Sequence, residues 1–119
     1  MGDIKIKRIY EAPSPADGMR VLVDRLWPRG VSKARAQLDA WLKDVAPSDE
    51  LRQWFDHRVD RWDEFRRRYR DELAANPATQ ALRDIVSDGP VTLLFGAKDT
   101  VHNEAVVLAE LLSEGAAPT

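Results

Sequence analysis

The stretch VTLLF, residues 91–95, is a continuous apolar run that follows the chain-breaking triplet Asp88-Gly89-Pro90. A short run of this kind, without alternating polar residues, is typical of a strand in a parallel sheet that is covered on both faces. Two other strands are expected before it. Residues 4–10 alternate isoleucine with lysine at first, and residues 20–26 begin as a second apolar run. The three segments predict a small sheet.

Helical periodicity fills the intervals between these strands. A short helix is expected near residues 32–38, and longer amphipathic stretches follow between residues 49 and 87 and again after residue 100. The predicted helix caps are Ser48, Asp60, and either Asp99 or Thr100 for the last helix. The spacing within residues 39–47 fits a helix and a strand equally, so it decides neither.

Strands separated by helices predict an α/β fold. We expect a single compact domain over residues 1–113, with a small, largely parallel sheet of about three strands covered by helices. Residues 114–119 are expected to form a frayed tail. A chain of 119 residues can bury a core without crosslinks, and this chain has no cysteine, which excludes disulfides, thiolate nucleophiles and cysteine-ligated zinc.

The composition is that of an ordinary folded protein, with 44% hydrophobic and 32% charged residues. Its net charge of -2 disfavours a dedicated nucleic-acid-binding protein. The first eleven residues lack the apolar core of a signal peptide, and no apolar run approaches the length of a membrane span. We therefore expect a cytoplasmic protein with no membrane partner, and its oligomeric state does not follow from the sequence.

Candidate site residues follow the second and third predicted strands. Ligands of open α/β sheets bind beyond the carboxyl ends of the strands, so the two groups meet at one rim if the strands are parallel neighbours. The predicted ligand-binding residues are Arg25, Trp27, Arg29, Lys98, Asp99 and Asn103. The rim formed by the motifs WPRG and AKDTVHNE is expected to bind an anionic, phosphate- or nucleotide-like small molecule.

Each of these residue types suits that ligand. Arg25, Arg29 and Lys98 supply positive charge, and the N-terminus of the last helix supplies free N–H groups. Trp27 offers a flat face for a ring. The alternative is purely structural: Arg25 pairs with a nearby aspartate, and Trp27 covers the core.

His102 is the candidate catalytic residue. The positive surroundings at a helix N-terminus favour a neutral imidazole, which can accept a proton as a general base. A histidine in this place can also merely cap its own helix. The sequence leaves open whether the protein is an enzyme.

Residues 58–72, RVDRWDEFRRRYRDE, carry six arginines and five acidic residues. Three oppositely charged pairs lie four residues apart, which is the spacing of ion pairs on a helix surface: Asp63 with Arg67, Glu64 with Arg68, and Arg68 with Glu72. We therefore predict a self-paired, solvated face. The alternative function is a regulatory or interaction protein that binds nucleic acid or a protein partner through the arginine-rich helix, residues 60–74.

No motif predicts a cofactor. The two histidines, His57 and His102, lack the spacing of a helical metal-binding pair. The chain also contains neither a glycine-rich phosphate loop nor a Gly-x-Ser-x-Gly turn. We expect no cofactor, no metal and no covalent nucleophile.

Five blocks of sequence together resemble the YeaO-like family of small bacterial proteins of unknown function. In chain order they are VDRLWPRGVSK, WLKDVAPS, LRQWFDH, WDEFRRRYRDEL and VTLLFGAKDTVHNEAVVL. The resemblance runs from about residue 4 to residue 112 and implies a compact α/β domain, but no activity. The motif members that it carries over are Arg25, Trp27, Pro28, Arg29, Gly30, Trp41, Pro47, Ser48, Trp54, Phe55, His57, Lys98, Asp99, His102 and Asn103. Family members often have Ala-Ala where this chain has Gly96-Ala97, which is expected to loosen the turn before the last helix.

Overall fold

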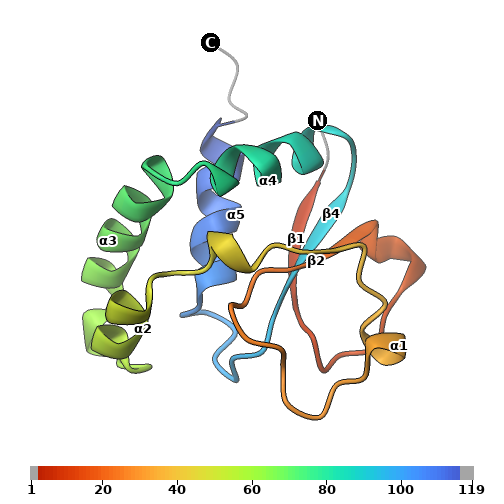
Figure 1. The fold of residues 1–119 in the computed structure, drawn as a ribbon, viewed down its shortest axis with the longest axis horizontal. Coiled ribbons are helices and arrows are strands. Elements are labelled where there is room, and N and C mark those ends of the chain that lie inside the picture. The colour runs from red at the N-terminus through yellow and green to blue at the C-terminus, as the bar shows by residue number, and fades with distance from the viewer. Residues whose placement is uncertain (1–2, 116–119) are drawn as a thin grey trace.

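The structure, a computed structural model, describes residues 3–115. Within these residues, four parallel strands form one sheet, in the spatial order β1-β4-β2-β3. The strands are β1 (Ile4–Arg8), β2 (Met19–Leu22), β3 (Ala40–Trp41) and β4 (Val91–Phe95). The prediction of an α/β fold with a parallel sheet is confirmed, with four strands in place of about three. Figure 1 shows β1, β4 and β2 side by side.

β4 lies between β1 and β2, and all five of its residues are buried. It pairs with β1 from Ile4↔Val91 onward and with β2 from Met19↔Val91 onward. Its continuous apolar sequence follows from this position, because both of its faces and both of its edges are covered.

β2 is shorter than predicted. It ends at Leu22, after which the Val23 N–H still donates to the Leu94 carbonyl, and residues 24–26 leave the sheet. The fourth strand, β3, is a two-residue edge strand paired with Val21 and Leu22, in the segment whose spacing fitted both a helix and a strand.

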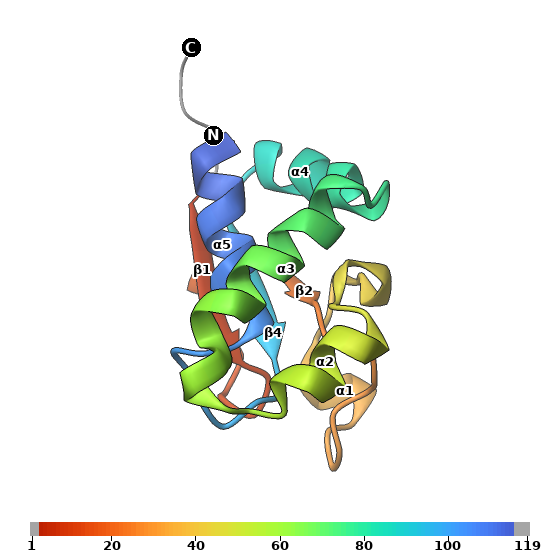
Figure 2. The ribbon, with the colours of Figure 1, turned by 90° about the vertical axis from the view of Figure 1, so that its left-hand side faces the viewer.

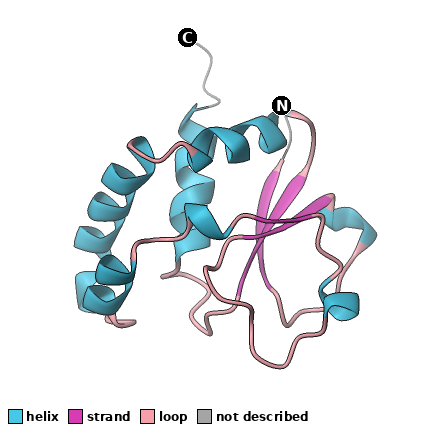
Figure 3. Ribbon diagram, viewed as in Figure 1, coloured by secondary structure: helices cyan, strands magenta, loops and turns pink. Residues whose placement is uncertain are grey.

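Five helices complete the described part of the chain (Figures 1 and 3). They are α1 (Lys33–Ala36), α2 (Asp49–Phe55), α3 (Trp62–Ala74), α4 (Ala78–Ser87) and α5 (Glu104–Gly115), with short 3-10 turns η1 (Pro15–Asp17), η2 (Lys43–Val45) and η3 (Val59–Arg61). Helix α5 runs to Gly115, and residues 116–119 of the predicted tail lie outside the described residues. Within residues 3–115, no helix is both long and apolar enough to cross a membrane.

The core has two unequal halves, one on each face of the sheet. Val91, Leu93 and Phe95 point to the larger half, which α2 to α5 cover, and Figure 2 shows α2 and α3 in front of the strands. Leu94 points the other way, into a smaller cluster with Ala36 of α1. The two faces follow from the alternation of side chains along a strand.

One predicted helix cap is confirmed and two are wrong. The confirmed cap is Ser48, whose hydroxyl accepts from the Leu51 N–H at the start of α2. Asp60 does not cap α3, because η3 leads directly into that helix and the Asp60 carboxylate pairs with Arg58.

The last helix also begins later than predicted. Asn103 caps α5, where its Oδ1 accepts from the Val106 N–H at 3.1 Å. Neither Asp99 nor Thr100 has this role, and Asp99 instead accepts from the N–H groups of Val101 and His102. A short polar side chain can satisfy nearby backbone groups in a turn as well as at a helix end.

A cluster of three charged residues joins β1, the turn η1 and β2. Arg20 on β2 is buried and donates to the Asp17 carboxylate and to the Ala36 carbonyl. Lys7 on β1 pairs with the same carboxylate at 3.0 Å. Burial alone raises the pKa of Asp17, but the hydrogen bonds from Lys7, the Ser14 N–H and Arg20 outweigh it and lower that pKa.

The arginines of α3 are paired with acidic residues. Glu64 accepts from both Arg67 and Arg68, so one of the three predicted pairs is present. Arg67 reaches Asp71 where Asp63 was expected, and Glu72 instead accepts from Ser48. Two further pairs cross from α3 to α5, namely Arg66 with Glu110 and Arg70 with Glu114.

Candidate functional site

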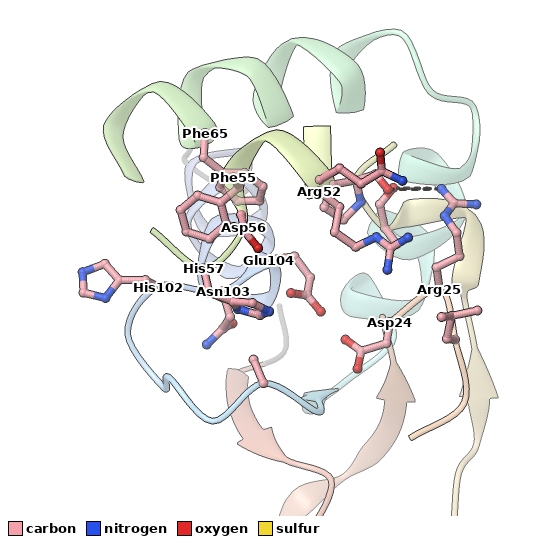
Figure 4. Close-up of a pocket in the computed structure, with 15 residues that line it drawn as sticks. Asp24, Arg25, Arg52, Phe55, Asp56, His57, Phe65, His102, Asn103 and Glu104 are labelled. Carbon is pink, nitrogen blue, oxygen red and sulfur yellow. Dashed lines mark hydrogen bonds between the residues drawn. The ribbon is translucent and has the colours of Figure 1, made fainter. Parts of the chain in front are cut away.

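A pocket of about 630 Å³ opens where β2 and β4 end, on the side of the sheet that α2 to α5 cover (Figure 4). Three segments supply most of its polar lining. Asp24 and Arg25 follow β2, His102, Asn103 and Glu104 lie at the start of α5, and Arg52, Gln53, Asp56 and His57 belong to α2 and the turn after it. The carboxyl edge of a parallel sheet is the usual position for a ligand site.

Asp24 ties the ends of the two strands together. Its Oδ2 accepts from the Gly96 N–H at 2.8 Å, directly beyond β4. A Cβ atom at Gly96 would lie 3.0 Å from the same oxygen. The glycine, which was expected to loosen this turn, therefore lets the backbone approach a carboxylate that lines the pocket.

Glu104, the first residue of α5, faces Asp24 within the pocket (Figure 4). Burial raises the pKa of Glu104 well above its usual range, and a hydrogen bond to Asp24 and the negative charge of Asp24 raise it further. Two neighbouring carboxyl groups do not both ionise easily, so Glu104 keeps its proton to a higher pH than an exposed glutamate does.

Arg25 lines the pocket with a guanidinium that is incompletely bonded. Its Nη2 lies 3.4 Å from the Ala46 carbonyl and 3.3 Å from that of Pro47, which are long hydrogen bonds. Its Nε is buried and makes no hydrogen bond within residues 3–115, and the Asp49 carboxylate lies 3.8 Å from it. Arg52 pairs with the same carboxylate, at 3.1 Å.

His102 is oriented by Asp99. The Nδ1 of His102 lies 2.9 Å from Asp99 Oδ2. The backbone N–H groups of Val101 and His102, and then the His102 side chain, lower the pKa of Asp99 to about 2. An ionised carboxylate can only accept, so Nδ1 donates to it and Nε2 takes no part in this hydrogen bond. The ring contacts Trp62 edge-on and points away from Asp24 and Glu104 (Figure 4).

The structure places the predicted site residues in two groups. Arg25, His102 and Asn103 line the pocket. Lys98 is exposed outside it, and Asp99 contributes only by holding His102 and by accepting from Asn103 Nδ2 through its carbonyl.

Most of the WPRG motif lies on another surface. Trp27 donates to the Val31 carbonyl at 2.6 Å and packs edge-on against Trp41, beside the smaller core cluster. Arg29 is exposed, and its carbonyl accepts from the Tyr10 hydroxyl. The segment that meets AKDTVHNE at the pocket is therefore the preceding Asp24-Arg25-Leu26.

Sequence reasoning missed the carboxyl pair and the contribution of α2. Asp24 is an acidic residue directly after a buried apolar run, and this signal could have marked it as a residue of the strand end. Glu104 lies next to the predicted Asn103. No sequence signal places Arg52, Asp56 and His57 opposite them, because only the folding of α2 over the strand ends does so.

In the described part of the chain, no group of three or more histidine or acidic side chains is arranged to hold a metal ion. The polar groups of the pocket are guanidinium, carboxyl, imidazole and amide groups, which suit hydrogen bonding to an organic ligand.

Residues 3–118 match the family model DUF488-N3i, which is described as the inactive DUF488-N3 subclade. The chain belongs to the DUF488-N3i family. Its relatives include YeaO of Escherichia coli, an uncharacterized protein. YeaO is 45% identical to this chain over 111 residues, which cover 92% of this chain and 96% of YeaO. The uncharacterized protein Rv3073c of Mycobacterium tuberculosis is 43% identical over 110 residues, which cover 92% of this chain and 93% of Rv3073c.

These similarities confirm the resemblance to YeaO-like proteins over nearly the whole DUF488-N3i chain. No solved structure matches the chain. The family assignment fixes no ligand, so any function rests on the pocket itself.

Proposed function

We propose that this DUF488-N3i protein binds an anionic, phosphate- or nucleotide-like small molecule in the pocket between Asp24 and His57. The observation that carries the proposal is the incomplete hydrogen bonding of the Arg25 guanidinium. Its guanidinium lines the pocket, and its buried Nε donates no hydrogen bond within residues 3–115. A buried donor without an acceptor costs free energy, which an anionic oxygen would recover.

The present partner of Arg25 is weak enough to be displaced. Asp49 has a side chain that is 64% exposed, and it lies 3.8 Å from Nε. Ion pairs at such exposed positions contribute about 0–1 kcal/mol. Arg52, which lines the same side of the pocket, shares this one carboxylate, so a ligand anion would meet two guanidinium groups (Figure 4).

The size of the pocket also favours a small molecule. Its volume of about 630 Å³ falls within the range of roughly 300–1,000 Å³ that is usual for small-molecule sites. Phe55 and Phe65 line part of it and provide apolar wall, which a nucleotide base or another ring could contact. Trp27 was predicted for this purpose, but it packs elsewhere.

The alternative function, binding of nucleic acid or protein through residues 60–74, has less support. Arg66, Arg67, Arg68 and Arg70 each pair with a carboxylate, either on α3 or on α5. Binding of phosphates would have to break these pairs, whereas the pocket offers a donor without an acceptor.

Acid–base catalysis by His102 is the second candidate function. One observation favours it: Asp99 holds Nδ1, and Nε2, which takes no part in that hydrogen bond, lies next to the pocket. The description of the family as an inactive subclade and the outward direction of the ring favour binding without turnover. We therefore give binding priority.

Calorimetric titration with inorganic phosphate and with adenosine monophosphate tests the proposal. Arg25→Gln is expected to weaken binding at least tenfold, because charged hydrogen bonds are worth about 1.5–3 kcal/mol. Arg29→Gln is the matched control, since it removes an arginine of the same segment that does not line the pocket. Absence of binding by the wild type at millimolar ligand, or equal losses in the two variants, would refute the proposal.

A further inference from the structure

We infer that the ligand carries a hydrogen-bond donor in addition to its anionic group, and that the facing carboxyl groups of Asp24 and Glu104 bind this donor. The inference rests on the proposed function and narrows its ligand class. The ligand is an organic anion, such as a phosphate monoester, with a hydroxyl or ammonium group away from its anionic end.

The chemistry of Asp24 and Glu104 determines which kind of ligand group they can bind. One oxygen of Asp24 accepts from the Gly96 N–H. Glu104 faces Asp24 in the pocket, and the raised pKa of Glu104 keeps its carboxyl group protonated to a higher pH than usual. An ionised carboxylate has only acceptor oxygens and a protonated carboxyl group keeps an acceptor oxygen, so the pair offers more acceptors than donors and favours a ligand group that donates.

The charged groups around the pair have other partners. From the loop after β2 and from α2, Arg25 and Arg52 both pair with Asp49. From α3, Tyr69 donates its hydroxyl to the Val45 carbonyl. From the start of α5, His102 is held by Asp99.

Two more titratable groups line the pocket from the turn after α2. Asp56 is a further acceptor, and His57 is exposed. Within residues 3–115, neither Asp24 nor Glu104 forms an ion pair with a lysine, arginine or histidine. The acceptors of the pair therefore face the pocket without a protein cation to satisfy them, which is where a ligand donor gains most.

A hydroxyl group and an ammonium group share this donor chemistry but differ in their effect on the proton. An ammonium group favours the charged form of the Glu104 carboxyl group and so releases the proton that Glu104 holds. A hydroxyl group leaves the proton in place. Proton release on binding therefore separates the two sources of the donor.

The test compares three matched series of phosphate monoesters with chains of two to five carbons. Alkyl phosphates have no terminal donor, ω-hydroxyalkyl phosphates have a neutral one, and ω-aminoalkyl phosphates have a charged one. At least one donor series should bind fivefold or more tightly than the alkyl phosphate of equal length. Calorimetry in buffers of different ionisation enthalpy should show more proton release with the ammonium series than with the other two series of equal length, because all three share the phosphate group and its own ionisation.

Two variants test whether Asp24 and Glu104 cause the preference for ligands with a donor group. Glu104→Gln and Asp24→Asn should each reduce the preference for the donor while binding of the alkyl phosphates persists. Glu110→Gln is the matched control on the same helix, since Glu110 pairs with Arg66 outside the pocket. The comparison of ligands on the wild-type protein does not depend on these variants folding.

The outcomes separate the two proposals. If all three series bind equally and the binding depends on Arg25, the proposed function stands and the inference is wrong. If no phosphate or nucleotide binds the wild type, the proposed function fails and the inference fails with it. A donor preference that survives both Asp24→Asn and Glu104→Gln also overturns the inference.

Discussion

Asp24 and Glu104 face each other in the pocket, although one follows β2 and the other begins α5 (Figure 4). Their meeting depends on the insertion of β4 beside β2, which brings the segment after β4 and the start of α5 next to the end of β2. The hydrogen bond from Gly96 to Asp24 fixes this approach. The carboxyl pair is thus a product of strand order.

Glu104→Gln should change the pH dependence of stability. Because the pKa of Glu104 is raised in the folded protein, the folded state binds more protons than the unfolded state above about pH 4.5, the usual value. The contribution of Glu104 to the free energy of unfolding is complete below that pH and is lost as the pH rises toward the raised pKa. Urea unfolding at several pH values between 4.5 and 8 measures it.

The relevant quantity is the difference in unfolding free energy between wild type and Glu104→Gln. It should fall as the pH rises, because the glutamine does not titrate. The same difference for Glu110→Gln serves as the control, since Glu110 is partly exposed and lies on the same helix. A difference for Glu104 that stays constant across this range contradicts the raised pKa.

Asp17→Asn should be strongly destabilising. It leaves the Arg20 guanidinium, whose side chain is 5% exposed, without its carboxylate. Loss of one partner of a buried ion pair costs about 3–5 kcal/mol. Chemical unfolding of this variant, beside Asp88→Asn at an exposed position, gives the comparison.

The pH dependence gives a second readout at Asp17. Its pKa is lowered in the folded state, so its contribution is complete above the usual value of 3.8 and is lost as the pH falls through the lowered pKa. Asp17→Asn should therefore lose part of the acid sensitivity of the wild type. Equal stability of Asp17→Asn and Asp88→Asn would contradict a stabilising role for the buried ion pair between Asp17 and Arg20.

Asn103→Ala should destabilise α5 and disturb the pocket together. The change removes the Oδ1 that accepts from Val106 and the amide that donates to the Asp99 carbonyl. Loss of a helix cap costs about 0.5–2 kcal/mol. Thermal unfolding should place Asn103→Asp between the wild type and Asn103→Ala, because aspartate keeps the cap but not the donor.

If Asn103→Asp and Asn103→Ala are equally destabilised, the cap is not the source of the effect. An intermediate value for aspartate instead divides the cost between the cap and the bond to Asp99.

Gly18→Ala and Gly30→Ala form a matched pair. Both glycines have positive φ, at 64° and 78°, so alanine strains the backbone at either position by roughly 1–2 kcal/mol. A Cβ atom at Gly18 would also lie 2.4 Å from the Pro90 carbonyl oxygen, whereas within residues 3–115 a Cβ atom at Gly30 would have no heavy atom within 4 Å except those of its chain neighbours. Gly18→Ala should therefore be the more destabilising of the two in urea unfolding.

The Pro90 carbonyl accepts from the Met19 N–H where β2 and β4 begin, so a shift there disturbs the sheet directly. Equal losses of stability in the two variants would show that the backbone strain dominates and the contact does not.

Sequence patterns predicted the strong elements of this fold. The uninterrupted VTLLF segment was predicted as a strand and residues 60–74 as a helix, and both elements are present as β4 and α3. β3 could not be predicted, because a two-residue edge strand is specified by its neighbour β2 and not by its own periodicity.

The site was predicted at the correct edge of the sheet, but the residues that line the pocket precede the predicted WPRG motif. Arg25, His102 and Asn103 line the pocket, whereas Trp27 and Arg29 do not. The chain leaves β2 at Leu22, earlier than the apolar pattern indicates, so the residues at the strand end are two to three positions upstream of WPRG. The position of α2 over the pocket depends on tertiary packing that no local pattern encodes.

The central place of β4 has a consequence for synthesis on the ribosome. β1 finds its neighbour in the sheet only when residues 91–95 emerge, long after β1 itself has left the exit tunnel. Until then β2 has only the two-residue β3 beside it, and both early strands lack the pairing that β4 provides. A nascent chain that stalls before β4 therefore presents unpaired strands, which makes it a substrate for chaperones and a hazard for aggregation.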